Sequence, residues 1–365
     1  MTRSTILIAG GGTGGHVFPG VAVAEAMQAL ADVEVVFCGT DRGVEARVVP
    51  AGGWKLERLD VVPIQGRGAA GAVRGAMVAA RATARAFGIV RALRPRAVLS
   101  VGGYASGPVA LAAALLGVPV AVLEPNSTVG LANRILAPFA KRAYLSWREA
   151  ASPFRADSLR WYGVPLRQSL RSPPYAARGT ARLLVMGGSQ GAAALNGRMP
   201  AAVARVARRV PALEVVHQAG RDRDAAVREA YAREKLERIT VVPFIDEVGR
   251  AIADADVVVA RAGAGTLAEL TAVGRASILV PFPHASDDHQ ARNAEALAHD
   301  GGAICLRQEA ATPERLASEI ERLLSDDAAR VAAASAARAH GRPDAAREIA
   351  GDLLGFAGIP LRGAA

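Results

Sequence analysis

The sequence has few cysteines, no signal-peptide pattern and no apolar run long enough to span a bilayer. Its 365 residues include two cysteines, Cys38 and Cys305, in no C-x-x-C pair. We therefore expect neither a disulfide framework nor a zinc site, and we expect the protein in a reducing compartment. The uncharged segment 107–123 is broken by Gly117 and Pro119 and is shorter than the ~20 residues of a bilayer span. The apolar start, 6–9, is too short for a signal peptide, so we expect a soluble protein that can touch a membrane.

Acidic residues are also missing from one long stretch. Between Asp60 and Glu124 there is none, whereas seven arginines occur, at positions 67, 74, 81, 85, 91, 94 and 96. The net charge of +10, from 44 Lys and Arg against 34 Asp and Glu, suits phosphate-rich partners such as nucleotides, nucleic acid or an anionic membrane. A helix predicted over 71–93 alternates these arginines with apolar residues. This pattern predicts that the helix lies on a membrane; the alternative is a solvated helix face. The predicted membrane face comprises Arg74, Arg81, Arg85, Leu115 and Leu116.

A repeated strand–turn–helix pattern indicates the fold. Strand 5–9 leads into the glycine-rich turn 10–15, and strand 182–186 leads into a second such turn, 187–191. Since the chain is too long for one core, this repeat predicts an α/β fold with two doubly wound Rossmann-like domains facing each other across a cleft. We place the domains at 1–163, joined by a C-terminal helix at 343–365, and at 164–342. The tail, 313–354, is predicted to form two helices.

The stretch 255–293 carries the strongest site signal. An apolar strand, 257–259, ends at Arg261, and a turn of small residues then opens a helix that carries Glu269. Another strand, 278–280, ends in a polar loop that includes Gln290. Backbone N–H groups at a helix N-terminus bind anions, and a carboxylate one turn further in suits a ribose. The pattern predicts a site for a nucleoside diphosphate.

Polar groups also follow three strands of the first half. Gly10, Gly12 and Gly15 match G-x-G-x-x-G, which permits a dinucleotide site or a turn without a ligand, but His16 and Pro19 stand where that motif wants a plain helix start. Gly102–Pro108 and Glu124 end the next strands. Ligands of open α/β sheets bind outside the carboxyl ends of the strands, so these groups are expected to line a crevice. Glu124 could instead be a buried, paired carboxylate.

Two D-x-D triplets raise the question of a metal. Asp254 and Asp256 precede their strand, at the wrong end for a ligand, and Asp222 and Asp224 are expected to cap a helix. We predict no metal site and no cofactor.

The ordered set of motifs resembles the MurG family of glycosyltransferases (glycosyltransferase family 28) over nearly the whole chain. The matching segments are 11–19, 102–108, Glu124 with Asn126, 187–192, 244–246, 261–269 and 287–293. The resemblance implies the two-domain GT-B fold and transfer of N-acetylglucosamine (GlcNAc) from UDP to the muramoyl 4-hydroxyl of undecaprenyl-diphospho-muramoyl-pentapeptide (lipid I), giving lipid II for peptidoglycan.

The same resemblance implies a set of donor-site residues. Arg167, Ser189 and the backbone of Ile245 would hold the uridine end, Glu269 the ribose, and Gln290 and Asn126 the sugar. The diphosphate would lie at the helix N-terminus, near Arg261. The glycine-rich turn of the N-terminal half would line the cleft from the other side, near the acceptor diphosphate. The remaining donor-site residues are Thr13, Gly14, Gly15, Ala264, Gly265, Thr266, Leu267 and Ala268.

Inverting transfer needs a base to accept the proton of the acceptor hydroxyl. His16 is the expected base, since an imidazole ordinarily titrates near neutral pH, and Glu124 is the second candidate. Gly12, Tyr104 and Ser106 are expected on the acceptor side. The expected substrates are UDP-GlcNAc and lipid I, and the expected location is peripheral, on the cytoplasmic face of the inner membrane. Proteins of cell-wall assembly are further expected partners, and nucleic acid is not.

The sequence departs from the family pattern at four positions. Leu123 and Pro125 replace a usual His and Gln, Val164 replaces an Asn, and Ala262 replaces a Ser. These departures bear on acceptor-side hydrogen bonds and leave the nucleotide contacts intact.

Three rival functions are weighed. A glycosyltransferase with a diacylglycerol acceptor would share the donor site and differ at 13–16 and 104–108. A UDP-GlcNAc 2-epimerase would not need the basic stretch. A nucleic-acid-binding protein is suggested by charge alone, but the basic stretch has a single aromatic residue, Phe87, for stacking bases.

Overall fold

The chain forms two compact α/β units, which we describe separately. The computed structural model describes residues 3–61, 69–166, 170–188, 191–285 and 288–363. Unit 1 comprises residues 1–167 and 344–365, and unit 2 comprises 168–343. The sequence-based boundaries were 1–163 with 343–365, and 164–342.

Unit 1 is built on a parallel sheet of seven strands in the order β3-β2-β1-β4-β5-β6-β7. The order reverses between β1 and β4, which pair in parallel beside each other. The inner strands β1, β4 and β5 are nearly continuous apolar runs, as expected when both faces of a parallel sheet are covered. The bounds of the seven strands are β1 Ser4–Gly10, β2 Val33–Gly39, β3 Lys55–Arg58, β4 Ala97–Gly102, β5 Val120–Glu124, β6 Ala140–Leu145 and β7 Leu159–Arg160.

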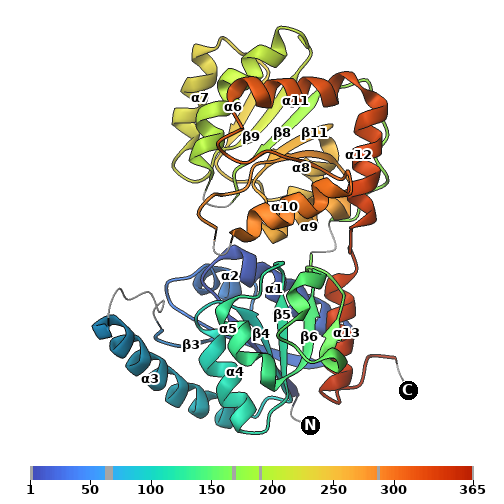
Figure 1. Ribbon diagram of the computed structural model, residues 1–365. Coiled ribbons are helices and arrows are strands. Elements are labelled where there is room, and N and C mark those ends of the chain that lie inside the picture. The colour runs from blue at the N-terminus through green and yellow to red at the C-terminus, as the bar shows by residue number, and fades with distance from the viewer. Residues whose placement is uncertain (1–2, 62–68, 167–169, 189–190, 286–287, 364–365) are drawn as a thin grey trace. The chain divides into compact units, whose positions relative to one another are not determined.

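Helices cover both faces of this sheet (Figure 1). One apolar core joins the sheet to α1 (Gly14–Leu30), α2 (Glu45–Ala51) and α13 (Ala345–Phe356). The other joins it to α3 (Ala69–Leu93), α4 (Ser106–Leu115) and α5 (Leu131–Leu136). Three short 3-10 helices complete the unit: η1 Ala137–Phe139, η2 Arg148–Ala151 and η3 Ala156–Ser158.

The last helix, α13, is an integral part of unit 1. Ile349, Ala350, Leu353 and Leu354 are fully buried in the same core as β1 and α1. On the polar side of α13, Asp352 accepts hydrogen bonds from Tyr144 Oη (2.8 Å) and Arg142 Nε (3.1 Å) on β6. The segment after residue 343 therefore completes a sheet-and-helix layer that the first 167 residues begin.

Unit 2 repeats the design with six parallel strands in the order β10-β9-β8-β11-β12-β13. Its order also reverses beside the first strand, between β8 and β11. The bounds are β8 Arg182–Met186, β9 Glu214–Gln218, β10 Ile239–Val242, β11 Val257–Ala260, β12 Ala276–Leu279 and β13 Ile304–Cys305.

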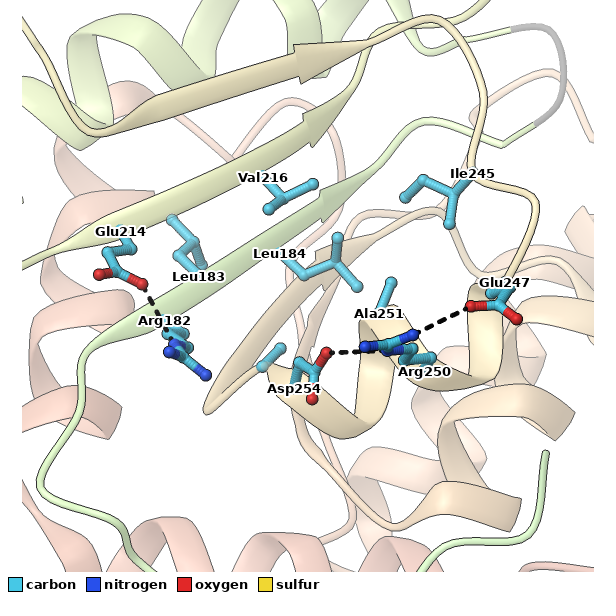
Figure 2. A pocket seen from close by; sticks show the side chains of 11 residues that line it. Arg182, Leu183, Leu184, Glu214, Val216, Ile245, Glu247, Arg250, Ala251 and Asp254 are labelled. Carbon is cyan, nitrogen blue, oxygen red and sulfur yellow. Dashed lines mark hydrogen bonds and ion pairs between the residues drawn. The ribbon is translucent and has the colours of Figure 1, made fainter. Parts of the chain in front are cut away.

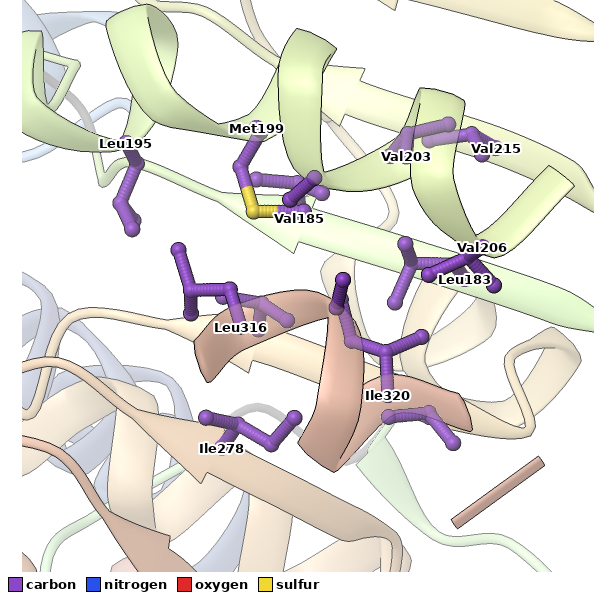
Figure 3. Close-up of a cluster of buried hydrophobic side chains, with 14 of the residues drawn as sticks. Leu183, Val185, Leu195, Met199, Val203, Val206, Val215, Ile278, Leu316 and Ile320 are labelled. Carbon is purple, nitrogen blue, oxygen red and sulfur yellow. The ribbon is translucent and has the colours of Figure 1, made fainter. Parts of the chain in front are cut away.

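One face of the second sheet is covered by α6 (Ala193–Ala207), α7 (Asp224–Arg233) and α11 (Pro313–Ser325). Figure 3 shows part of this core, which includes Met199 and Val203 of α6, Leu316 and Ile320 of α11, and Val185 of β8. The remaining helices of unit 2 are α8 (Val248–Asp254), α9 (Ala264–Val273), α10 (His289–His299) and α12 (Asp327–Ala339).

The prediction of two helices in the tail is wrong, because the structure has three. Asp326 accepts a hydrogen bond from the amide of Ala329 (2.9 Å) and so caps the start of α12, which separates it from α11. A side-chain cap of this kind commonly starts a helix. Gly341 and Pro343 then lie between α12 and α13.

The D-x-D residues have structural partners. Asp256 is buried and accepts from Tyr175 Oη, Thr180 Oγ1 and the amide of Arg182, at 2.8 to 2.9 Å. The expected capping of α7 is wrong: the N-cap is Arg223 without a side-chain hydrogen bond, and Asp224 instead pairs with Arg228 (2.6 Å).

Among the described residues, no helix is both long enough and apolar enough to cross a membrane.

Candidate functional sites in the two units

Each sheet has one switch point, where neighbouring strands send their connections in opposite directions. In open α/β sheets this is where ligands bind, outside the carboxyl ends of the strands. In unit 1 the turns after β1 and β4 meet there, and in unit 2 the turns after β8 and β11 meet there. The residues predicted for the site concentrate on these four turns.

The two glycine-rich turns of unit 1 are packed backbone against backbone. The amide of Gly11 donates to the carbonyl of Gly102 (3.3 Å). A Cβ on Gly103, whose φ is +83°, would lie 2.1 Å from the Gly11 carbonyl oxygen. Any side chain at Gly103 would separate the turns, so the glycine is needed for their close approach.

His16 lies in the first turn of α1, beside these glycines. Its Nδ1 is 3.2 Å from Thr13 Oγ1, and the ring packs on Gly102, where an added Cβ would come within 3.0 Å of Nε2. The tautomer with its proton on Nδ1 donates to Thr13 and leaves a lone pair on Nε2. The structure therefore brings Thr13, Gly14, Gly15 and His16 together at the carboxyl end of β1.

Glu124 is almost fully buried at the end of β5 and holds the following loop. Its Oε1 accepts from the amide and side chain of Asn126 (3.1 and 3.2 Å), and its Oε2 accepts from the Gly130 amide (2.9 Å) and Asn133 Nδ2 (3.0 Å). Burial raises the pKa of Glu124, and these donors partly offset the rise. With both oxygens engaged, the carboxylate has the geometry of a loop anchor, which was the alternative at the sequence level.

The acceptor-side residues differ in exposure. Tyr104 is half exposed, whereas Ser106 is buried and donates to the Gly103 carbonyl (2.8 Å). Gly12, whose φ is +95°, donates its amide to Glu45 Oε2 (2.8 Å). Leu123 and Val164, two of the departures from the family pattern, are buried apolar positions.

Sequence reasoning missed Glu45 and Asn133. Asn133 bonds Ser100 on β4 (2.9 Å) as well as Glu124 and the Leu123 carbonyl on β5. Each lies on a short helix and belongs to no motif. Three glycines surround Glu45 in the fold, but their positions in the sequence do not reveal this.

In unit 2 a buried polar chain holds the backbone that follows β9, against which the turn after β8 packs. Asn196 donates to the Ala219 carbonyl (2.9 Å) and accepts from His217 Nε2 (3.1 Å), while His217 Nδ1 accepts from Tyr231 Oη (2.9 Å). Burial lowers the pKa of His217 to about 4, so it is neutral. A Cβ on Gly191 would lie 2.2 Å from the Ala219 oxygen. Ser189, of the same turn, lies outside the described residues, as does Arg167.

The predicted diphosphate site is a helix N-terminus without a side-chain cap. The N-cap of α9 is Gly263, and the first intrahelical hydrogen bond runs from the Leu267 amide to the Gly263 carbonyl (3.0 Å). The amides of Ala264, Gly265 and Thr266 precede it and are the donors such a terminus offers to an anion. Leu267 is buried, whereas Ala268 and Glu269 are partly exposed one turn further along.

Arg261 and Gln290 both fasten the loop after β12. Arg261 donates through Nη1 to the carbonyls of Val280 and Pro281 (3.1 and 3.0 Å) and through Nη2 to Gln308 (2.8 Å). Gln290 Oε1 accepts from the Phe282 amide (3.0 Å). Desolvation is the main cause that lowers the pKa of Arg261. Arg261 is half-buried and stands two residues before Gly263, the N-cap of α9.

A separate hollow of about 460 Å³ lies on the sheet of unit 2 (Figure 2). Leu184, Val216 and Ile245 form apolar walls. Arg182 pairs with Glu214 (3.1 Å), and Arg250 pairs with Glu247 (3.5 Å) and Asp254 (3.9 Å). Because both arginines face carboxylates, this hollow offers little positive charge to a diphosphate.

Two Rossmann-type units, each with glycine-rich turns at its switch point, are the architecture of the GT-B fold. The family models for the glycosyltransferase family 28 N-terminal and C-terminal domains match residues 6–145 and 182–349. The chain belongs to this family, within its MurG branch.

Two curated relatives carry the name UDP-N-acetylglucosamine–N-acetylmuramyl-(pentapeptide) pyrophosphoryl-undecaprenol N-acetylglucosamine transferase. The protein from Sorangium cellulosum is 54% identical over 98% of this chain and 89% of its own length. The one from Syntrophotalea carbinolica is 43% identical over 94% of this chain and 96% of its own.

Two solved structures are also similar. A crystal structure of Acinetobacter baumannii MurG matches with a TM-score of 0.79 and 32% identity, covering 97% of this chain and 99% of that one. A UDP-N-acetylglucosamine 2-epimerase matches with a TM-score of 0.67 at 14% identity, over 98% of this chain and 97% of that one. At that identity the second match reflects a shared fold alone.

Proposed function

We propose that this protein transfers GlcNAc from UDP-GlcNAc to lipid I and so forms lipid II in peptidoglycan synthesis. The observation that carries the proposal is the 54% identity, over 98% of the chain, to a relative named for this transfer. The geometry agrees with it: one unit offers a histidine on a glycine-rich turn, and the other offers an anion-binding helix terminus.

On the donor side, the amides of Ala264, Gly265 and Thr266 hold the diphosphate, and Glu269 accepts hydrogen bonds from the ribose hydroxyls. The backbone of Ile245, with Arg167 and Ser189, holds the uridine end, while Gln290 and Asn126 contact the sugar. Oriented N–H dipoles stabilise the charge that develops on the leaving UDP. The half-buried positive charge of Arg261, two residues before the N-cap of α9, adds to them.

On the acceptor side, His16 acts as the base. The 4-hydroxyl oxygen of the muramoyl sugar attacks C1 of GlcNAc, the bond from C1 to the β-phosphate oxygen breaks, and the hydroxyl proton passes to His16 Nε2. Attack from the face opposite UDP inverts C1. His16 is favoured over Glu124, because both oxygens of Glu124 already accept hydrogen bonds from the loop.

We expect the reaction to need no metal ion. The helix N-terminus and Arg261 supply the positive potential that a divalent cation supplies elsewhere.

We further propose that unit 1 docks on the cytoplasmic face of the inner membrane. From residue 61 to 148 the one acidic residue is Glu124, which is 2% exposed. Arg81 and Arg85 of α3 are exposed, and Ala82, Ala86 and Val90 of the same helix pack inward. The side chain of Arg74, also on α3, lies outside the described residues.

Exposed apolar side chains on the neighbouring helices support this docking. They are Leu115 at the end of α4, and Leu131, Ile135 and Phe139 along α5 and η1, with exposures of 42 to 64%. Leu116, beside Leu115, is half-buried. Such side chains amid basic residues suit an anionic leaflet, which is also where proteins of cell-wall assembly would meet the enzyme.

The test is release of UDP from UDP-GlcNAc, with and without a lipid I analogue, in the presence of a chelator. We expect release that depends on the acceptor and survives chelation. His16→Ala should lower kcat by about 10²- to 10⁴-fold, whereas His299→Ala, on the exposed end of α10, should match wild type. Absence of transfer with lipid I, together with epimerised UDP-sugar, would assign the scaffold to the epimerases instead.

A further inference from the structure

We propose that Glu45 is a positioning residue, which fixes the glycine-rich turn so that Thr13 and His16 face the acceptor. The proposal rests on the function proposed above, in which His16 is the base. Glu45 lies at the start of α2 and is 1% exposed.

The carboxylate of Glu45 accepts hydrogen bonds from two separate segments. Its Oε2 accepts from the Gly12 amide (2.8 Å), and its Oε1 accepts from the amide and hydroxyl of Thr40 (3.0 and 2.7 Å). It thereby joins the turn after β1 to the turn after β2. All three donors are neutral, so the link between the two turns is made by hydrogen bonds and needs both carboxylate oxygens of Glu45 as acceptors.

Gly12 is held from both of its backbone groups. Besides its amide, its carbonyl accepts from the amide of Val44 (3.3 Å), the residue next to Glu45. Gly12 has a φ of +95°, which L side chains rarely adopt. The start of α2 therefore sets the position and conformation of the residue immediately before Thr13.

From Gly12 the constraint passes directly to the proposed base. Thr13 is the N-cap of α1, and its carbonyl accepts from the amides of His16 and Val17 (3.2 Å each). Its hydroxyl contacts His16 Nδ1. A shift of Gly12 would thus move the origin of α1 and the partner of the imidazole together.

The space around the carboxylate is made by glycines. A Cβ on Gly11, Gly39 or Gly43 would come within 2.1, 2.7 or 2.0 Å of a Glu45 side-chain atom. The backbone thus closes directly on this side chain, and little room is left for it to rotate. A side chain at any of these three positions would therefore displace Glu45.

Glu45→Gln tests the proposal with little change in shape. The carboxamide keeps one acceptor and gains an NH2, so one of the two N–H donors, on Gly12 or on Thr40, must face a donor. Thr40→Val is the matched control, because it removes one hydrogen bond to the same carboxylate and leaves the bond to Gly12. Glu57→Gln on β3 controls for loss of charge nearby.

We expect Glu45→Gln to lower kcat with a lipid I analogue by about 10- to 100-fold, since small misplacements of a catalytic group are costly. The KM for UDP-GlcNAc should stay within about threefold, because the diphosphate and ribose contacts belong to unit 2. Thr40→Val and Glu57→Gln should lower kcat by less than about threefold. An unchanged kcat in Glu45→Gln, or a loss in Thr40→Val that is as large at equal melting temperature, would overturn the proposal.

A readout without turnover separates this inference from the proposed function. In NMR spectra of ¹⁵N-histidine-labelled protein, the His16 ring signals should shift in Glu45→Gln and stay in place in Glu57→Gln. If wild type fails to transfer GlcNAc while the His16 signals shift, the function is wrong and the positioning stands. Unshifted signals in a folded Glu45→Gln protein would refute the positioning.

Discussion

At the scale of single residues, unit 1 uses two buried carboxylates, Glu45 and Glu124, to shape its loops. Glu45 and Glu124 both accept hydrogen bonds from backbone amides and neutral side chains. A buried carboxylate pays less for desolvation when several donors surround it. These residues therefore define loop conformations that glycines alone would leave loose.

Glu124→Gln should reduce the free energy of unfolding by roughly 1 to 3 kcal/mol, since the new NH2 must face an existing donor. The pH profile of kcat/KM should keep the limb that reports the base, whereas His16→Ala should lose it. Denaturant unfolding and rate profiles on the same variants measure both effects. A Glu124→Gln enzyme without that limb would make Glu124 the base and displace His16.

At the scale of elements, β9 carries a titratable core residue. His217 is fully buried, and burial lowers its pKa to about 4. Between about pH 6.5 and 4 the unfolded chain binds a proton that the folded chain does not. Stability is therefore retained above that window and lost as the pH falls through it.

We predict that the β9 amides lose up to ~3 kcal/mol of protection against hydrogen exchange between pH 7 and pH 4. The value follows from the difference between the pKa of His217 in the folded protein, about 4, and its ordinary value. Hydrogen exchange of unit 2 measures it. His217→Gln, which does not titrate, should be less stable at pH 7 but show a smaller decline. Equal slopes for the two proteins would place the acid sensitivity elsewhere.

The attachment of α13 is the second prediction at this scale. Asp352→Ala removes the partner of Tyr144 Oη and Arg142 Nε. Leaving these groups without their acceptor should lower the free energy of unfolding of unit 1 by roughly 2 to 4 kcal/mol. Tryptophan fluorescence reports on unit 1, because Trp54, Trp147 and Trp161 all belong to it. Arg155→Ala, which cuts the exposed pair with Asp157, is the control and should cost under ~1 kcal/mol.

At the scale of the whole molecule, charge is distributed unevenly along the chain. Arg81 and Arg85 are exposed on α3, and the adjacent α4 exposes Leu115. Further along, α5 and η1 expose leucine, isoleucine and phenylalanine. Replacing Arg74, Arg81 and Arg85 with Gln should weaken binding to anionic vesicles by about 1 kcal/mol per residue. The variant should turn over a soluble lipid I analogue at the wild-type rate. The control Arg233→Gln, on α7, should have the same turnover. Unchanged vesicle binding, measured by sedimentation at low salt, would leave α3 a solvated helix.

The sequence predicts most of the strands, because apolar runs such as 182–186 end in glycines at a switch point. It also predicts the uncapped start of α9, which follows from small residues after a buried strand. The prediction of two helices in the tail was wrong because the sequence rich in alanine and arginine looks continuous, although Asp326 caps a new helix within it. Glu45 was beyond reach, since its partners lie on two turns that only the folded sheet brings together.

The path of the chain, out of unit 1 and back as α13, has a consequence for biosynthesis. Translation delivers unit 2 whole, residues 168–343, before the final helix of unit 1 leaves the ribosome. Until then the part of the apolar core of unit 1 that receives Ile349 and Leu353 stays uncovered, although α1 and α2 already pack on the same face of the sheet. Unit 1, which is made first, therefore completes its folding last. A chain that ends before residue 345 exposes the apolar surface to which α13 would bind, and chaperones bind such surfaces.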